Sequence, residues 1–243
     1  MTTLFISDLH LDPSRPHITA LFREFLRGEA RDAEALYILG DLFEAWIGDD
    51  DPEPHHAGVI TDLHALAASG VPLYFMHGNR DFLIGGEFAR RAGCTLLPDP
   101  TLIDLYGTPA LLLHGDTLCT DDLAYQEFRR MVRDPVWQRE FLAQPLAARQ
   151  AFAERARAAS QSETRQKAET IMDVNADAVT AVMREYRTPL MIHGHTHRPA
   201  VHDFAVDEQP ATRIVLGDWY EQGSVLRCTA EGQWLHALPL NHP

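Results

Sequence analysis

The segment TLFISDLH (residues 3–10) joins an apolar run, which predicts a buried strand, to the polar side chains of Asp8 and His10. The same pattern recurs in ALYILGD (35–41) and in LYFMHGNRD (73–81). It occurs twice more, in ALLLHGD (110–116) and in LMIHGHTH (190–197). Because ligands bind at the carboxyl ends of strands in open α/β sheets, we expect these five polar ends to meet in one site.

The segments between the first three predicted strands have helical spacing. Apolar residues recur every three or four positions in 18–26, and 55–68 has the same character before Gly70. Strand, helix and strand in this rhythm predict βαβ units and a layered α/β fold. Further strands are predicted as a hairpin at 102–105 and 110–114, and then at 190–193, 200–205, 212–216, 223–228 and 233–238.

The composition limits the class of protein. With 243 residues, 45% of them apolar, the chain predicts one large domain or one domain with an insertion. The net charge of −14 opposes a protein that tracks nucleic acid. The apolar runs fall far short of the ~20 residues that span a bilayer, and we expect no signal peptide. The three cysteines, Cys94, Cys119 and Cys228, resemble neither a disulfide framework nor a zinc site, which favours a reducing cytoplasm.

Residues 119–187 differ in composition from the rest and predict a helical insert between two parts of a core, 1–118 and 188–243. Segment 121–187 holds eleven basic and eleven acidic residues, so the remainder carries the whole net charge of −14. This distribution is typical of a cap over an anionic ligand, and equally of a solvated helical subdomain.

The polar strand ends supply seven candidate metal ligands: Asp8, His10, Asp41, Asn79, His114, His195 and His197. Each motif alone is compatible with a turn or a helix cap. Seven ligands together are too many for one tetrahedral site and suit two ions that share a carboxylate. Nitrogen and oxygen donors of these types favour Mn²⁺, Fe or Zn²⁺ over Mg²⁺.

Other polar or aromatic residues near these motifs receive structural interpretations. Asp81 and Asp116 are interpreted as partners that orient histidine ligands. Asp49 to Asp51 are expected to form an exposed acidic loop, and Trp219 and Tyr220 to belong to the core.

Outside the insert, this ordered series of motifs resembles the calcineurin-like metallophosphoesterase superfamily. The resemblance implies an α/β fold, a two-layer β-sandwich flanked by helices, here with a helical cap inserted. It also implies two divalent metal ions, most consistent with Mn²⁺, and attack by metal-activated water. Carried over to this chain, the first ion takes Asp8, His10, Asp41 and His197, and the second takes Asp41, Asn79, His114 and His195.

Arg80 departs from the superfamily pattern, which often has histidine after Gly-Asn. Arginine does not readily give up its proton, but its guanidinium can donate two parallel hydrogen bonds to one phosphate. A leaving group that is itself a phosphate needs its charge neutralised more than it needs a proton, so Arg80 favours a pyrophosphate substrate. The alternative is a surface arginine in a turn.

A narrower resemblance covers nearly the whole chain and rests on GNRDFL (78–83), HGD (114–116) and the insert. It is to the branch of the superfamily that acts in lipid A biosynthesis. The implied reaction is attack of water on the α-phosphorus of UDP-2,3-diacylglucosamine, giving UMP and 2,3-diacylglucosamine 1-phosphate. The implied catalytic residues are Asn79, Arg80 and His195, and the implied substrate contacts add Asp122, Ser160, Thr164 and Lys167. Thr164 stands where this branch leads us to expect asparagine.

The helical spacing of the insert adds Arg157 to this set, because Arg157, Ser160, Thr164 and Lys167 share one helix face. Such a face suits a phosphate and a sugar, and also plain solvent. Aromatic residues predict either an acyl-chain groove or ordinary core: Phe82, Phe128, Phe141 and Phe152.

Arg129, Arg130 and Arg133 suit an anionic membrane surface, which predicts peripheral contact with the cytoplasmic face of the inner membrane, while salt bridges to nearby acids are the alternative. Two other functions stay open at this point: hydrolysis of a soluble nucleotide pyrophosphate or phosphodiester, and a scaffold without catalysis. A scaffold is expected to have lost ligands, whereas all seven are present.

Overall fold

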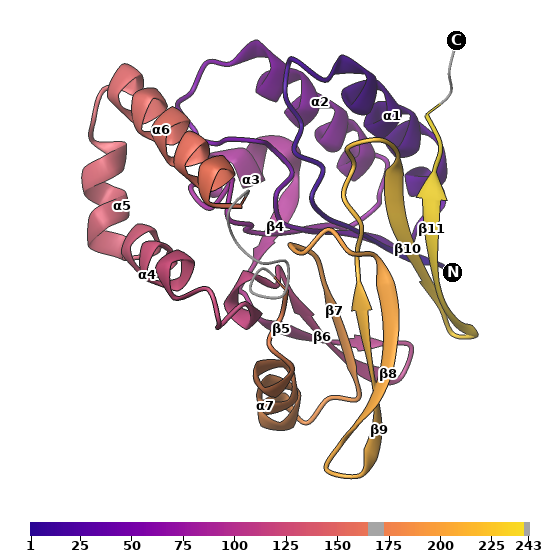
Figure 1. The fold of residues 1–243 in the computed structure, drawn as a ribbon. Coiled ribbons are helices and arrows are strands. Elements are labelled where there is room, and N and C mark those ends of the chain that lie inside the picture. Colours follow the sequence, from indigo (N-terminus) through magenta and orange to yellow (C-terminus); the bar gives the residue numbers. More distant parts are fainter. Residues whose placement is uncertain (165–172, 241–243) are drawn as a thin grey trace.

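The computed structural model describes residues 1–164 and 173–240, apart from the side chains of 161–164. Its centre is a pair of sheets packed face to face (Figure 1). The six-stranded sheet has the order β11-β10-β1-β2-β3-β4 and the five-stranded sheet the order β5-β6-β7-β9-β8. The first consists of β1 (Thr3–Ile6), β2 (Ala35–Leu39), β3 (Leu73–Met76), β4 (Cys94–Leu97), β10 (Gly223–Thr229) and β11 (Gly232–Leu238). The second consists of β5 (Thr101–Leu105), β6 (Thr108–Leu113), β7 (Leu190–His193), β8 (Ala200–Val206) and β9 (Gln209–Val215).

The strands that carry the polar ends run parallel within each sheet. β1, β2 and β3 pair in parallel, and so do β6 and β7. These strands are buried on both faces, because alternate side chains enter two different cores. Phe5 packs between the sheets, while Leu4 and Ile6 pack under the helices. The parallel order brings the carboxyl ends of these strands to one edge of the sandwich.

Helices cover both outer faces of the sandwich (Figure 1). The six-stranded sheet packs against α1 (Pro16–Arg27), α2 (Pro54–Ala68) and α3 (Gly86–Ala92). The five-stranded sheet packs against α7 (Ala176–Tyr186), through Val179 and Met183. The layered α/β fold expected from the sequence is therefore confirmed, and so are its predicted strands and its hairpin at β5 and β6.

The sequence analysis missed α3 and β4, and it placed Asp49 wrongly. The carboxylate of Asp49 accepts hydrogen bonds from the backbone N–H groups of Gly85, Glu87 and Phe88, at 2.9, 3.0 and 2.9 Å. It therefore caps the N-terminus of α3 instead of lying in an exposed acidic loop. A cap supplied from a distant loop gives no local signal in the segment that it stabilises.

Helices α4 (Leu123–Val132), α5 (Pro135–Leu142) and α6 (Leu146–Thr164) form an arch beside the sandwich, on the side away from both termini (Figure 1). Asp122 and Asp134 cap α4 and α5 with their carboxylates. The arch is fastened to the core by Arg149, whose side chain is only 2% exposed. Arg149 donates to the carbonyl oxygen of Ile47 at 2.7 Å and forms an ion pair with Asp50 at 2.5 Å.

Candidate active site

The polar strand ends are drawn together by hydrogen bonds between their backbones. The N–H of Asp8, after β1, donates to the carbonyl of Gly40, after β2, at 3.0 Å, and the N–H of His10 donates to that of Asp41 at 2.8 Å. In the other sheet, the N–H of Gly194 donates to the carbonyl of His114 at 2.8 Å. These hydrogen bonds hold the loops that carry the polar residues next to one another.

Asp8 joins the two sheets at this edge. Its Oδ2 accepts hydrogen bonds from the Ser7 hydroxyl at 2.6 Å and from the backbone N–H of His195 at 2.9 Å. A Cβ at position 194 would lie 2.3 Å from the same oxygen, so only glycine allows the two loops to approach this closely. The other oxygen, Oδ1, is buried and has no hydrogen-bond partner among the described residues; Nε2 of His197 lies 3.4 Å from it.

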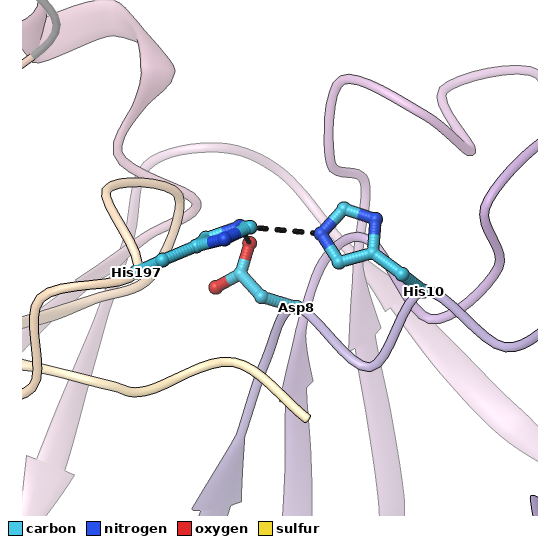
Figure 2. A group of neighbouring side chains, drawn as sticks. All are labelled: Asp8, His10 and His197. Atoms are coloured by element: carbon cyan, nitrogen blue, oxygen red, sulfur yellow. Dashed lines mark hydrogen bonds and ion pairs between the residues drawn. The ribbon is translucent and has the colours of Figure 1, made fainter. Parts of the chain in front are cut away.

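One half of the candidate centre consists of Asp8, His10 and His197 (Figure 2). The Nε2 atoms of the two histidines lie 3.2 Å apart, and Nε2 of His197 lies 3.4 Å from Oδ1 of Asp8. Two imidazole nitrogens bound to one cation at ~2.1 Å are separated by about this distance. The three side chains therefore point at a common position.

The other half consists of Asn79, His114 and His195. Oδ1 of Asn79 lies 2.9 Å from Nε2 of His114 and 2.9 Å from Nδ1 of His195. Asp41 stands between the halves, with its Oδ2 3.7 Å from Nε2 of His10 and 3.9 Å from Nε2 of His114. The structure thus brings all seven candidate ligands into one continuous group, with Asp41 in the position of a shared carboxylate.

The backbone of this group is strained. Nine non-glycine residues of the described chain have φ in the left-handed region, and five of them are Asp8, His10, Asp41, His195 and His197. Such conformations are rare outside glycine and persist where the surrounding structure enforces them, often at functional sites. The strain is therefore concentrated on the residues that aim side chains at the candidate centre.

The electrostatics of the group fit a cation. Burial lowers the pKa of His114, but the charges of Asp41 and Asp8 outweigh it and raise that pKa to about 9. Burial also opposes the charged form of His197, yet its contact with Asp8 raises its pKa. The field that favours protons on these buried rings equally favours divalent ions in their place. Together with Oδ1 of Asp8, which is buried and faces Nε2 of His197 at 3.4 Å, this shows that the donor set suits metal ions.

Asp81 supports the loop that carries Asp41. Its carboxylate accepts hydrogen bonds from the backbone N–H groups of Leu42 at 2.8 Å, Gly78 at 2.9 Å and Asp41 at 3.3 Å. Burial, and then the charge of Asp41, raise its pKa to about 6. Asp116 is also fully buried and accepts from the Tyr125 hydroxyl and from Nε of Arg129, each at 2.8 Å.

Glu44 is a site residue that sequence reasoning missed. It is 6% exposed, and its Oε2 lies 3.1 Å from Nδ1 of His10. Its Oε1 lies 3.1 Å from Nε of Arg157, which comes from α6. One buried carboxylate therefore contacts both a candidate metal ligand and the arch. No motif flags Glu44, because it meets both partners through tertiary structure.

Replacing Glu44 with glutamine is expected to weaken binding of divalent metal by about 10- to 100-fold, the range typical of partners that orient a ligating histidine. The amide keeps the size of the side chain but removes its negative charge. In the wild type that charge favours a proton on Nδ1 of His10, so that Nε2 of His10 is free to bind the metal. Isothermal titration of the metal-free protein with Mn²⁺ measures this effect. Glu87→Gln, which changes an exposed glutamate on α3, is the matched control and should bind as the wild type does. Equal affinities for the wild type and Glu44→Gln would contradict the prediction.

A cavity of about 820 Å³ opens over the candidate centre. Ten of the twelve residues predicted to contact substrate line it: Asn79, Arg80, Phe82, Asp122, Phe128, Phe141, Phe152, Arg157, Ser160 and His195. The other two fall outside what is described: Lys167 entirely, and Thr164 for its side chain. Core and arch thus enclose one space.

Aromatic side chains form one wall of the cavity. Phe82, beyond β3, lies 6.4 Å from Trp137 of α5, measured between ring centroids. Trp137 stacks on Phe141 at 4.8 Å, and Phe141 meets Phe152 of α6 at 5.2 Å. Phe141 is 4% exposed and also belongs to the main core. Phe82, Phe141 and Phe152 therefore serve as core and as cavity lining at once, and Trp137 packs against the core beside them.

Two interpretations of individual residues need correction. Tyr220 is not core: it is 42% exposed, lines the cavity and stacks on His10 with ring centroids 5.4 Å apart. Arg129 and Arg133 do not face a surrounding surface. Arg129 bonds the buried Asp116, and Arg133 donates to the carbonyl of Gly78 at 2.8 Å while its guanidinium lies over the Phe82 ring. Of the three arginines, only Arg130 is exposed.

Comparison with known proteins agrees with this geometry. The model of the calcineurin-like phosphoesterase family matches residues 1–199. A protein of Xanthomonas axonopodis pv. citri (strain 306) is 61% identical, over 99% of this chain and 100% of its own, and is named UDP-2,3-diacylglucosamine hydrolase. A protein of Stenotrophomonas maltophilia (strain K279a) has the same name and is 60% identical, over 98% of this chain and 99% of its own.

A solved structure described as a novel archaeal phosphodiesterase superimposes with a TM-score of 0.51, at 12% identity, over 98% of this chain and 100% of that one. At this identity the likeness concerns the fold.

Proposed function

The chain belongs to the calcineurin-like phosphoesterase family, and on that premise we propose that it hydrolyses the pyrophosphate bond of UDP-2,3-diacylglucosamine, giving UMP and 2,3-diacylglucosamine 1-phosphate. It is a metal-dependent hydrolase. The observation that carries the proposal is the cavity, which places Arg80 and an aromatic wall beside the seven candidate ligands. The full-length relatives at 60% and 61% identity carry the name of this activity.

The seven side chains would hold two divalent ions, one on Asp8, His10, Asp41 and His197, the other on Asp41, Asn79, His114 and His195. When bound, the ions supply activated water and draw charge from the phosphoryl oxygens. Four imidazoles, two carboxylates and one amide oxygen are a mixed nitrogen and oxygen set, which supports Mn²⁺ over Mg²⁺.

Arg80 is positioned to act on the leaving phosphate. Its backbone N–H donates to Oδ1 of Asp41 at 2.8 Å, which fixes the residue at the centre, and its side chain lines the cavity. Its Nε is buried and has no hydrogen-bond partner in the part of the chain that the structure describes. The guanidinium would neutralise the charge that develops on the sugar phosphate as the bond breaks. Asn79 and His195, which lie in contact beside it, would orient the phosphoryl group under attack.

The arch would act as a cap that holds the diacylated sugar. Arg157, Ser160 and Asp122 line the cavity from α6 and from the N-terminus of α4 and would bind a phosphate and a sugar of the substrate, together with Thr164 and Lys167. The aromatic wall would receive the acyl chains, because hydrocarbon gains most from burial against apolar surface. In this assignment the cap proper comprises α4 to α6, while α7 belongs to the core.

The reaction can be tested by ³¹P NMR in ¹⁸O-labelled water, with Mn²⁺-loaded protein. UDP-2,3-diacylglucosamine should be cleaved with ¹⁸O in UMP, whereas UDP-N-acetylglucosamine, which lacks the acyl chains, should be cleaved far more slowly. Equal cleavage of both compounds would favour a pyrophosphatase of soluble nucleotides and remove the acyl-chain role of the aromatic wall. Cleavage of neither, with metal bound, would overturn the proposed function.

We also propose that the protein works at the cytoplasmic face of the inner membrane. Among the described residues, no helix is long and apolar enough to cross a membrane. Helices α4 and α5 instead expose Leu123 (77%), Met131 (45%), Val136 (50%) and Leu142 (39%), and Arg130, which precedes Met131, is exposed as well. Apolar side chains flanked by a cation suit the interface of an anionic bilayer.

The double substitution Leu123→Ser and Val136→Ser is expected to lower partitioning onto vesicles about tenfold. Each of the two side chains, when half of it enters the bilayer interface, contributes ~1 kcal/mol or less to binding. Sedimentation with vesicles of phosphatidylethanolamine and phosphatidylglycerol measures it. The matched control replaces Leu102 and Val201 with serine; they are 47% and 54% exposed on the five-stranded sheet. An equal loss in both double variants would contradict docking through the arch.

A further inference from the structure

Three residues that line the cavity each carry a buried donor atom with no hydrogen-bond partner among the described residues: Arg15 at Nη1, Arg80 at Nε and Thr196 at its hydroxyl. Burying a donor without a partner costs free energy, and native proteins rarely accept it without cause. The two guanidinium nitrogens can only donate and the hydroxyl can donate as well, so a ligand rich in acceptor oxygens would satisfy all three. The other terminal nitrogen of Arg15, Nη2, already donates to the carbonyl of His10. Arg80 is accounted for by the leaving phosphate, but the proposed function gives Arg15 and Thr196 no role.

Arg15 and Thr196 lie at the end of the centre formed by His10 and His197. Thr196 is the residue between His195 and His197. The Arg15 guanidinium lies 4.7 Å from the centroid of the Tyr220 ring, and that ring lies 5.4 Å from the rings of both His10 and His197. The backbone N–H of Trp219 donates to the carbonyl of Asp8 at 3.1 Å, which fixes the Tyr220 loop to the end of β1.

The aromatic wall lies on the other side of Asp41. The aromatic wall joins the core at the loop after β3, which contains Gly78 and Phe82. Arg133 of the arch donates to the carbonyl of Gly78, and its guanidinium lies over the Phe82 ring. In the six-stranded sheet, β2, which carries Asp41, separates β1 from β3. Neighbouring strands are ~4.8 Å apart, so the two loops flank the centre about 10 Å from each other. The cavity therefore has an apolar side at β3 and a hydrogen-bonding side at β1.

We propose that Arg15, Thr196 and Tyr220 form a subsite for the nucleoside monophosphate half of the substrate, an inference that rests on the proposed function. The substrate is linear, with its pyrophosphate between a nucleoside and a diacylated sugar. If the acyl chains occupy the β3 side and the pyrophosphate the centre, the nucleoside extends toward β1. There the donors of Arg15 and Thr196 meet phosphate, ribose and base oxygens, and Tyr220 offers its half-exposed ring.

The test measures binding of UMP to Mn²⁺-saturated protein by isothermal titration. Thr196→Val keeps the shape and removes the hydroxyl, and should weaken UMP binding about 5- to 10-fold; Arg15→Met removes a charged donor and should weaken it about 10- to 100-fold. Thr196→Ser restores the hydroxyl and should restore the affinity. Phe152→Leu, on the aromatic wall, is the control and should bind UMP as the wild type does. For 2,3-diacylglucosamine 1-phosphate in detergent, Phe152→Leu should weaken binding, whereas Thr196→Val and Arg15→Met should bind it as the wild type does.

Metal affinity is measured in the same variants, so that a lost cation is not mistaken for a lost subsite. Unchanged UMP affinity in Thr196→Val and Arg15→Met would overturn the subsite, even if the wild type hydrolyses the lipid substrate. Equal competition by orthophosphate and by UMP would overturn the nucleoside part of the assignment. Conversely, loss of UMP binding in both variants would support the subsite even if the wild type fails to cleave the lipid, an outcome that counts against the proposed function alone.

Discussion

Replacing Asp41 with asparagine is expected to lower kcat/KM about 10³-fold or more, while the metal-free protein stays at least as stable as the wild type. The carboxylate of Asp41 lies between the two halves of the centre, with Oδ2 3.7 Å from Nε2 of His10 and 3.9 Å from Nε2 of His114. An amide has no charge with which to hold two cations, and metal ions contribute several kcal/mol of transition-state stabilisation.

The expected stability of metal-free Asp41→Asn follows from the close packing of three buried carboxylates. Asp41 is 2% exposed, Asp8 and Asp81 are fully buried, and the charge of Asp41 contributes to the raised pKa of Asp81. Removing that charge relieves this repulsion but also removes the attraction to a protonated His114, whose pKa is raised to about 9. The melting temperatures are therefore compared above pH 9, where His114 is neutral and only the relief of repulsion remains. The asparagine oxygen can still accept the hydrogen bond from the Arg80 backbone N–H, so the loop keeps its support.

The measurements are steady-state hydrolysis in Mn²⁺ and the melting temperature after chelation. Asp104→Asn is the control, because Asp104 is exposed and only closes the turn before Gly107; its kcat/KM should equal that of the wild type. If Asp41→Asn keeps kcat/KM within tenfold of the wild type, Asp41 does not bridge metals. A lower melting temperature without metal would instead show that the carboxylate holds the fold.

The parts of the fold predicted from sequence are those whose signal is local. Strands β1, β2, β3 and β7 are continuous apolar runs that end in polar residues, and both features can be read along the chain. Helix α3 has seven residues and takes its cap from Asp49, which lies more than thirty positions earlier. Such a helix exists because of tertiary contacts, and a local pattern cannot predict it.

The site divides in the same way. The candidate ligands were found because each follows a strand, and parallel strands deliver their carboxyl ends to one edge. Glu44, Arg15 and Tyr220 occupy loops with no periodic pattern, and their partners come from other segments. Arg129 and Arg133 were placed on an outer surface because helical charge usually faces solvent. The structure turns them inward, because the buried Asp116 and the carbonyl of Gly78 need partners there.

Replacing Arg80 with histidine is expected to lower kcat for the pyrophosphate substrate about 10²- to 10³-fold at pH 8, the loss seen when one preorganised charge stabiliser is removed. The departing sugar phosphate has a second pKa of ~6, so at this pH it leaves as an anion that needs charge neutralised and no proton. Arginine stays charged, whereas an imidazole with an ordinary pKa of ~6.5 is mostly neutral at pH 8. The deficit should therefore shrink as the pH falls toward 6.

The same substitution should improve relative activity on a phosphodiester whose leaving group is an alkoxide, such as the methyl ester of UMP, because an alkoxide needs the proton that an imidazolium can donate and a guanidinium cannot. The informative quantity is the ratio of kcat/KM for the two substrates, measured from pH 6 to 8 in the wild type, Arg80→His and Arg80→Lys. Arg80→Lys keeps a point charge without the fork and should retain the wild-type ratio at an intermediate rate. Arg27→His, at the exposed end of α1, should change neither rate nor ratio. A pH-independent ratio in Arg80→His would mean that position 80 acts by shape alone, and that the preference for a pyrophosphate is set elsewhere in the cavity.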